Sequence, residues 1–203
     1  MFDFLAKGGV LVIPILFCSV VALTIFMERI IRFSKIKNHG SGLAENTIQM
    51  LNQGKEKDAR DMLVKSNAPM GRVLLQAIDV IDQDRDTLET VIANSTDEEV
   101  RDLSSYVQAL ATMGNIAPLL GLLGTVMGMI KAFMVIQQMG GKVNAAVLAG
   151  GIWEAMLTTA LGLAVALPTM VAHSYLLSRV DKYEASLQSG AVAFIKGIGK
   201  QKD

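Results

Sequence analysis

Three apolar blocks dominate this sequence, and each is long enough to cross a lipid bilayer as a helix. They lie at about residues 10–27, 113–136 and 145–177, and a helix needs about 20 apolar residues to span the hydrocarbon. Hydrophobic residues make up 51% of the 203 residues, which is an ordinary fraction. The distribution of these residues, with nearly all charges outside the blocks, therefore predicts an integral membrane protein with a sizeable polar domain.

Basic residues near the blocks predict the orientation of the chain. The first block has no small-x-small cleavage site behind it, so we expect an uncleaved anchor. One side offers only Lys7 and Lys142 in short segments. The other side carries Arg29, Arg32, Lys35, Lys37, Arg179 and Lys182. By the positive-inside rule, we expect the N-terminus outside and the C-terminus inside, in the cytoplasm.

The polar region between the first two blocks shows the periodicity of helices and no useful length of strand-like alternation. The predicted fold is all-α, with three transmembrane helices, a helical cytoplasmic domain and long helices that extend from the membrane into the cytoplasm. The expected organisation is an N-terminal segment with the first transmembrane helix (1–34), the helical cytoplasmic domain (35–112), the second transmembrane helix (113–138), a short external loop with the third transmembrane helix (139–177), and a cytoplasmic C-terminal helix and tail (178–203).

The segment Asn94-Ser95-Thr96 allows two interpretations. Thr96 and Glu99 have the spacing of a capping box that would start a helix there. Equally, one helix could run unbroken from about Asp86 into the second block. The sequence leaves both open.

Small residues form a stripe along each of the last two blocks. In the second block, Gly121, Gly124 and Gly128 recur at helical spacing, with Thr125 as the one deep hydroxyl. In the third block, Gly162 lies on a similar stripe. Small residues let membrane helices approach closely, so helix packing is the simplest interpretation of these glycines.

The third block also carries Glu154, Thr158 and Thr159. A carboxylate inside a spanning helix costs about 2.5–3.5 kcal/mol, so it normally faces a protein partner or a watery path. At about 100° per residue, Glu154 lies well round the helix from Thr159, so the two need not line one surface. Glu154 could contact a neighbouring subunit, lie near the mouth of an ion path, or only hold helices together. Lys131 is expected to snorkel to the outer edge.

Two strings within these blocks, APLLGLLGTV at residues 117–126 and EAMLTTALGL at residues 154–163, resemble the signature helices of the MotA/TolQ/ExbB proton channel family. The similarity is greatest to the ExbB branch and covers essentially the whole chain. The segment before the first block is shorter than in some members of that branch, which keeps a TolQ-like assignment open.

The resemblance implies a ring-forming stator subunit of the bacterial inner membrane, assembled as a homopentamer around an ExbD-like single-span partner. A membrane aspartate of that partner would carry the proton, and a TonB-like protein would receive the work. By motif position, Thr125 and Thr159 would line the pore, and Glu154 would be the glutamate of the third span, with Thr158 beside it.

Other classes of function are expected less. A TolQ-like or MotA-like stator and a non-conducting scaffold remain alternatives. No catalytic residue, cofactor, metal ligand set or nucleic-acid partner is expected. The acidic run at residues 79–86 lacks the glycine and final glutamate of a calcium loop, and His173 has no obvious catalytic partner near the membrane. Proton and sodium remain equally open as the transported ion.

Overall fold

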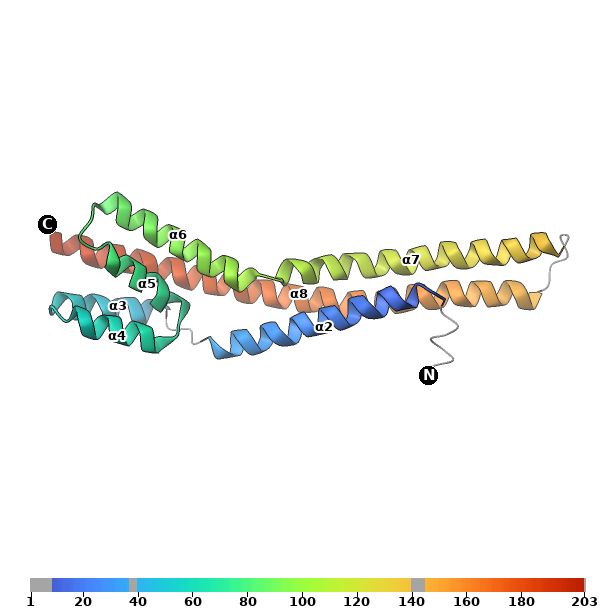
Figure 1. The fold of residues 1–203 in the computed structure, drawn as a ribbon, viewed down its shortest axis with the longest axis horizontal. Coiled ribbons are helices and arrows are strands. Elements are labelled where there is room, and N and C mark those ends of the chain that lie inside the picture. The colour runs from blue at the N-terminus through green and yellow to red at the C-terminus, as the bar shows by residue number, and fades with distance from the viewer. Residues whose placement is uncertain (1–8, 37–39, 140–144, 203) are drawn as a thin grey trace. The chain divides into compact units, whose positions relative to one another are not determined.

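The computed structural model describes residues 9–36, 40–139 and 145–202, and every regular element in them is a helix (Figure 1). The all-α prediction is therefore confirmed for these residues. Lys7, Lys37 and Lys142, which entered the orientation argument, lie outside them. The helices are α2 (Val12–Lys35), α3 (Gly40–Asn52), α4 (Glu56–Ser66), α5 (Pro69–Asp79), α6 (Arg85–Ser104), α7 (Val107–Gln138) and α8 (Ala145–Lys202).

The chain divides into two compact units. The first, called here the membrane unit, combines the described residues of Met1–Glu28 with Tyr106–Tyr175. The second, the polar unit, combines Arg29–Ser105 with the described residues of Leu176–Asp203. α2 and α8 contribute to both units, because each continues beyond its apolar stretch.

Three helical stretches of the described chain are long and apolar enough to cross a membrane. They are Val12–Lys35, Arg85–Gln138 and Leu148–Gly199. The apolar part of the second is α7, whose mean composition is far more hydrophobic than that of α6. The three helices expected from the sequence are therefore present, each able by length and composition to span a membrane.

The polar unit has its own hydrophobic core, formed by short helices packed on the end of α8. α4 ends at Ser66 with Asn67 in the left-handed region (φ 48°), and Pro69 then starts α5, where a missing N–H costs nothing. The core includes Leu63, Met70, Val73, Leu74, Leu88 and Phe194, each at most 6% exposed. Such burial contributes about 1.5–3 kcal/mol for each large side chain.

α6 resolves the ambiguity at Asn94-Ser95-Thr96 in an unexpected way. The helix begins after Asp84, whose carboxylate accepts a hydrogen bond from the Thr87 N–H at 3.0 Å, so the interpretation in which a helix starts at Thr96 does not hold. α6 runs through Thr96 and ends at Ser104. Tyr106 follows in the left-handed region (φ 62°) before α7 begins, so the interpretation of one unbroken helix does not hold either.

Two arginines of α2 bind the end of α6 within the polar unit. Arg29, only 1% exposed, donates to the Asp102 carbonyl at 3.4 Å and to Ser105 Oγ at 2.7 Å. Arg32 pairs with the Asp102 carboxylate. The last carbonyls of a helix have no partner within that helix, so these contacts stabilise the helix end at this point.

Candidate functional site

The membrane unit buries its small residues and exposes its large apolar ones. Along α7 the buried positions are Gly114, Ala117, Gly121, Gly124, Gly128 and Ala132, whereas Leu119 is 63% and Phe133 59% exposed. A soluble helix would show the reverse pattern. The exposed faces suit lipid or neighbouring helices, and the small-residue face packs on α8, which runs alongside α7 (Figure 1).

Backbone approaches backbone where Gly121 and Gly162 meet. A methyl group on Gly162 would lie 2.6 Å from the Ala117 carbonyl oxygen, and one on Gly121 would lie 3.0 Å from the Thr158 carbonyl oxygen. Thr159 Oγ1 donates a hydrogen bond to the Gly121 carbonyl at 3.0 Å. The two helices therefore depend on glycine for their separation, and a threonine joins them.

Thr158 is the most deeply buried threonine of the motif, at 1% exposure. It lies against Gly124, where an added methyl would overlap its hydroxyl. Its Oγ1 donates to the Ala155 carbonyl at 2.8 Å. Gly128, four residues after Gly124, lies against Ala155 and Gly151 in the same way.

Thr125 and Thr159 are each partly exposed, unlike Thr158. Thr125 Oγ1 donates to the Leu122 carbonyl of its own helix at 2.6 Å. In all three threonines a backbone carbonyl therefore takes the hydroxyl proton. Each oxygen keeps lone pairs that could accept a proton-bearing group or a water.

Glu154 forms an ion pair with Lys131, with 2.6 Å between Oε1 and Nζ. The Glu154 side chain is 23% exposed and that of Lys131 51%. Both border a cavity of about 60 Å³ that is also lined by Val10, Leu11, Gly124, Met127 and Thr158. Such a volume holds a few water molecules where polar groups are present.

The turn that leads into α2 closes over this ion pair. Gly9 has φ +71°, and a Cβ there would collide with the Glu154 carboxylate. The Gly9 carbonyl accepts from the Val12 N–H at 3.3 Å. Only a residue without a side chain fits this approach, since both the backbone angle and the space favour glycine.

The structure thus brings Glu154 and Thr158 to one cavity, and it joins Thr159 to Gly121 at a separate point of the α7–α8 contact. Sequence reasoning missed the ion-pair role of Lys131 and the role of Gly9. One signal could have found the lysine: it is the single cation inside an apolar block, and the third block holds a single carboxylate.

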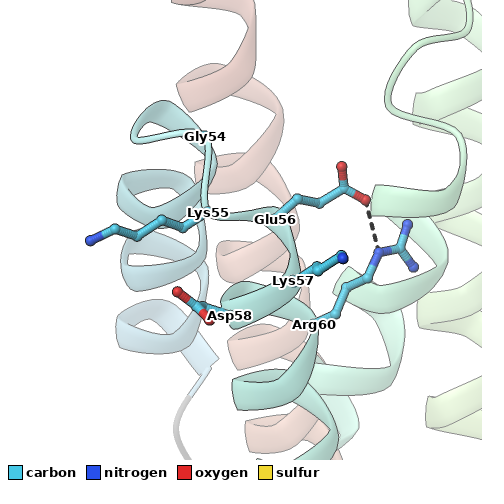
Figure 2. A pocket seen from close by; sticks show the side chains of 6 residues that line it. All are labelled: Gly54, Lys55, Glu56, Lys57, Asp58 and Arg60. Atoms are coloured by element: carbon cyan, nitrogen blue, oxygen red, sulfur yellow. Dashed lines mark hydrogen bonds and ion pairs between the residues drawn. The ribbon is translucent and has the colours of Figure 1, made fainter.

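An open hollow of about 540 Å³ lies in the polar unit at the turn between α3 and α4 (Figure 2). Of its lining side chains, Arg60 binds Glu56 at 2.9 Å, and Arg60 also binds Asp79 of α5 at 2.5 Å. The hydrogen bond that Arg60 donates to the Asp79 carboxylate raises the pKa of Arg60. Lys55 extends away from Arg60 (Figure 2). We assign this hollow no ligand. Within the described residues, no group of His, Cys, Asp and Glu could hold a metal ion.

Known proteins resemble this chain over most of its length. Residues 65–189 match the model of the MotA/TolQ/ExbB proton channel family. The chain is 28% identical to biopolymer transport protein exbB1 of Vibrio cholerae over 184 residues, which cover 89% of this chain and 80% of that protein. It is 29% identical to an ExbB-like biopolymer transport protein of Synechocystis over 204 residues, covering 99% and 77%.

A shorter stretch resembles another branch. Over 87 residues the chain is 39% identical to the Tol-Pal system protein TolQ of Haemophilus influenzae, covering 42% of this chain and 37% of that protein. The matched family model spans more than half of the sequence. As the resemblance predicted, this multi-pass membrane protein is a transporter rather than an enzyme and belongs to the MotA/TolQ/ExbB proton channel family.

Proposed function

We propose that this protein is the ring-forming subunit of a proton-driven motor in the bacterial inner membrane, with an ExbD-like partner that couples proton flow to TonB-dependent outer-membrane transport. The ring is a homopentamer around the partner's single membrane helices. The N-terminus is periplasmic, and the polar unit is cytoplasmic. The names of the relatives, biopolymer transport proteins of the ExbB type, support this branch.

The Lys131–Glu154 ion pair is the observation that carries the proposal. The three apolar blocks contain no aspartate, and Glu154 is their one carboxylate. Its charge is already compensated within the chain at 2.6 Å. A carboxylate that must gain and lose a proton in each cycle is therefore better supplied by a partner, and the ring supplies a polar lining.

Thr125 and Thr159 are the proposed lining residues. Both are partly exposed, and both keep lone pairs free after their hydroxyl protons bind backbone carbonyls. Hydroxyl oxygens can solvate a passing ion or water at low dielectric without carrying charge. In this proposal Glu154 lies at the outer mouth of the path, and Thr158 borders the same cavity.

The test replaces each lining threonine by valine, which keeps the shape and removes the hydroxyl. Thr112 of α7 and Thr169 of α8 are matched controls, because each donates to a backbone carbonyl of its own helix, at 3.0 Å and 2.7 Å. We expect Thr125→Val and Thr159→Val to lower energy-dependent outer-membrane uptake at least about tenfold, a change of about 1.4 kcal/mol in barrier height. Ring assembly, measured in the same detergent extract, should be unchanged.

The alternatives give different results. A TolQ-like role predicts normal uptake with a loss of envelope integrity, measured as detergent sensitivity of the cells. A MotA-like role predicts normal uptake with a loss of motility. A non-conducting scaffold predicts that rings fail to form. Normal uptake with normal envelope integrity and motility would remove both hydroxyls from the mechanism.

A further inference from the structure

The counter-ion of Glu154 comes from the same chain. Lys131 of α7 reaches the carboxylate of α8 at 2.6 Å. A lysine at this depth would otherwise extend its ammonium to the membrane surface. Here, instead, the side chain bridges two helices, and its ammonium pairs with the Glu154 carboxylate.

The Lys131–Glu154 pair is surrounded mostly by uncharged residues, so the loss of either charge would leave the other without a counter-ion. Of the residues that line the cavity, Lys131 and Glu154 are the charged ones, and the others are apolar, glycine or threonine. The turn at Gly9 lies against the carboxylate. In such a low-dielectric place an uncompensated charge is costly and attracts a counter-ion strongly.

Without the lysine, the cavity would have the chemistry of a small-cation site. The Glu154 carboxylate would supply one negative charge, and Thr158 Oγ1 would supply a neutral oxygen, since its proton is used by the Ala155 carbonyl. Oxygen ligands inside a membrane protein suit sodium ions. The volume of about 60 Å³ leaves room for an ion and a water.

We propose that Lys131 is a specificity-determining residue, which as the built-in counter-ion of Glu154 keeps metal cations out of this cavity. The ammonium occupies the electrostatic position that a sodium ion would take. The cavity is thereby neutral, and a free cation gains nothing by entering it. This inference rests on the proposed function for its meaning, because it makes the outer end of the path selective for protons over sodium.

The experiment measures sodium binding by the purified full-length protein, through its melting temperature in sodium chloride and in choline chloride at equal ionic strength. We compare wild type, Lys131→Gln, Lys131→Arg and the double variant Lys131→Gln with Glu154→Gln. At sodium about tenfold above its dissociation constant, binding stabilises by about RT ln 11. That corresponds to a Tm increase of about 3–6 °C in a chain of this size.

The expected result is a sodium-dependent rise in Tm for Lys131→Gln alone. Wild type, Lys131→Arg and the double variant should melt at the same temperature in both salts. Equal melting of Lys131→Gln in both salts would overturn the proposal. If Lys131→Gln does not fold, folding of the double variant supports the counter-ion role, and its failure shows that Lys131 acts by packing and overturns it. Neither transport nor a partner enters this measurement, so its failure is separate from failure of the proposed function.

Discussion

Gly162→Ala tests whether glycine sets the distance between α7 and α8. The added methyl would meet the Ala117 carbonyl oxygen at 2.6 Å, the Gly121 Cα at 3.1 Å and the Gly121 nitrogen at 3.3 Å. All three neighbours are backbone atoms, so no flexible side chain can move aside. The helices must separate at this point, which also stretches the bond from Thr159 Oγ1 to the Gly121 carbonyl.

The change in the free energy of unfolding follows from two costs and one gain. Overpacking costs about 1–3 kcal/mol, and loss of an interhelical hydrogen bond in a membrane costs about 0.6 kcal/mol. Alanine returns about 1 kcal/mol of helix propensity. Gly162→Ala should therefore lower the free energy of unfolding by about 0.5–2.5 kcal/mol.

Gly150→Ala is the matched control on the same helix, because a methyl there would meet nothing within 4 Å. It should stabilise the protein by about 1 kcal/mol. The two variants should thus differ in Tm by at least about 3 °C, measured by thermal unfolding in one detergent. A Gly162→Ala protein that melts at or above the temperature of Gly150→Ala would refute the reasoning.

Two further predictions concern the polar unit. Thr96 is 6% exposed, and its hydroxyl has no hydrogen-bond partner among the described residues, so Thr96→Val should raise the free energy of unfolding by about 1 kcal/mol in chemical denaturation. Ser95→Ala removes a hydroxyl that is hydrogen-bonded to Gln76 and to the Val91 carbonyl, so it should lower the free energy of unfolding by about 1 kcal/mol. Equal effects of Thr96→Val and Ser95→Ala on the free energy of unfolding would contradict this reasoning. The hydrogen bond from the Thr87 side chain, and then the one from the Thr87 backbone, lower the pKa of Asp84. The ionised Asp84 carboxylate therefore stabilises the folded protein fully at pH values above the ordinary pKa of an aspartate. This contribution is lost as the pH falls through the lowered pKa. Asp84→Asn, a cap that does not titrate, should therefore flatten the acid limb of the melting profile, and an unchanged limb would count against this role.

Local physical chemistry made much of the fold predictable. The lengths of the apolar blocks predicted the three spans, since the bilayer sets how many residues a helix needs. Helical periodicity predicted that the region between the first two spans is helical, and the structure places α3, α4, α5 and α6 there. The break at Tyr106 could not be foreseen, because a tyrosine has no local preference for the positive φ that it adopts there.

The candidate site shows the same division. The sequence by itself determined which polar residues lie in apolar blocks and which small residues share a helix face, because both follow from composition and a 3.6-residue period. Only the tertiary structure decided that Lys131 meets Glu154, that Thr159 meets the Gly121 carbonyl, and that Gly9 covers the carboxylate. Those pairings depend on the rotation and axial register of one helix against another. The spacing of residues within one helix does not set the rotation or the axial register of that helix against its neighbour. The close packing of the glycine faces sets both.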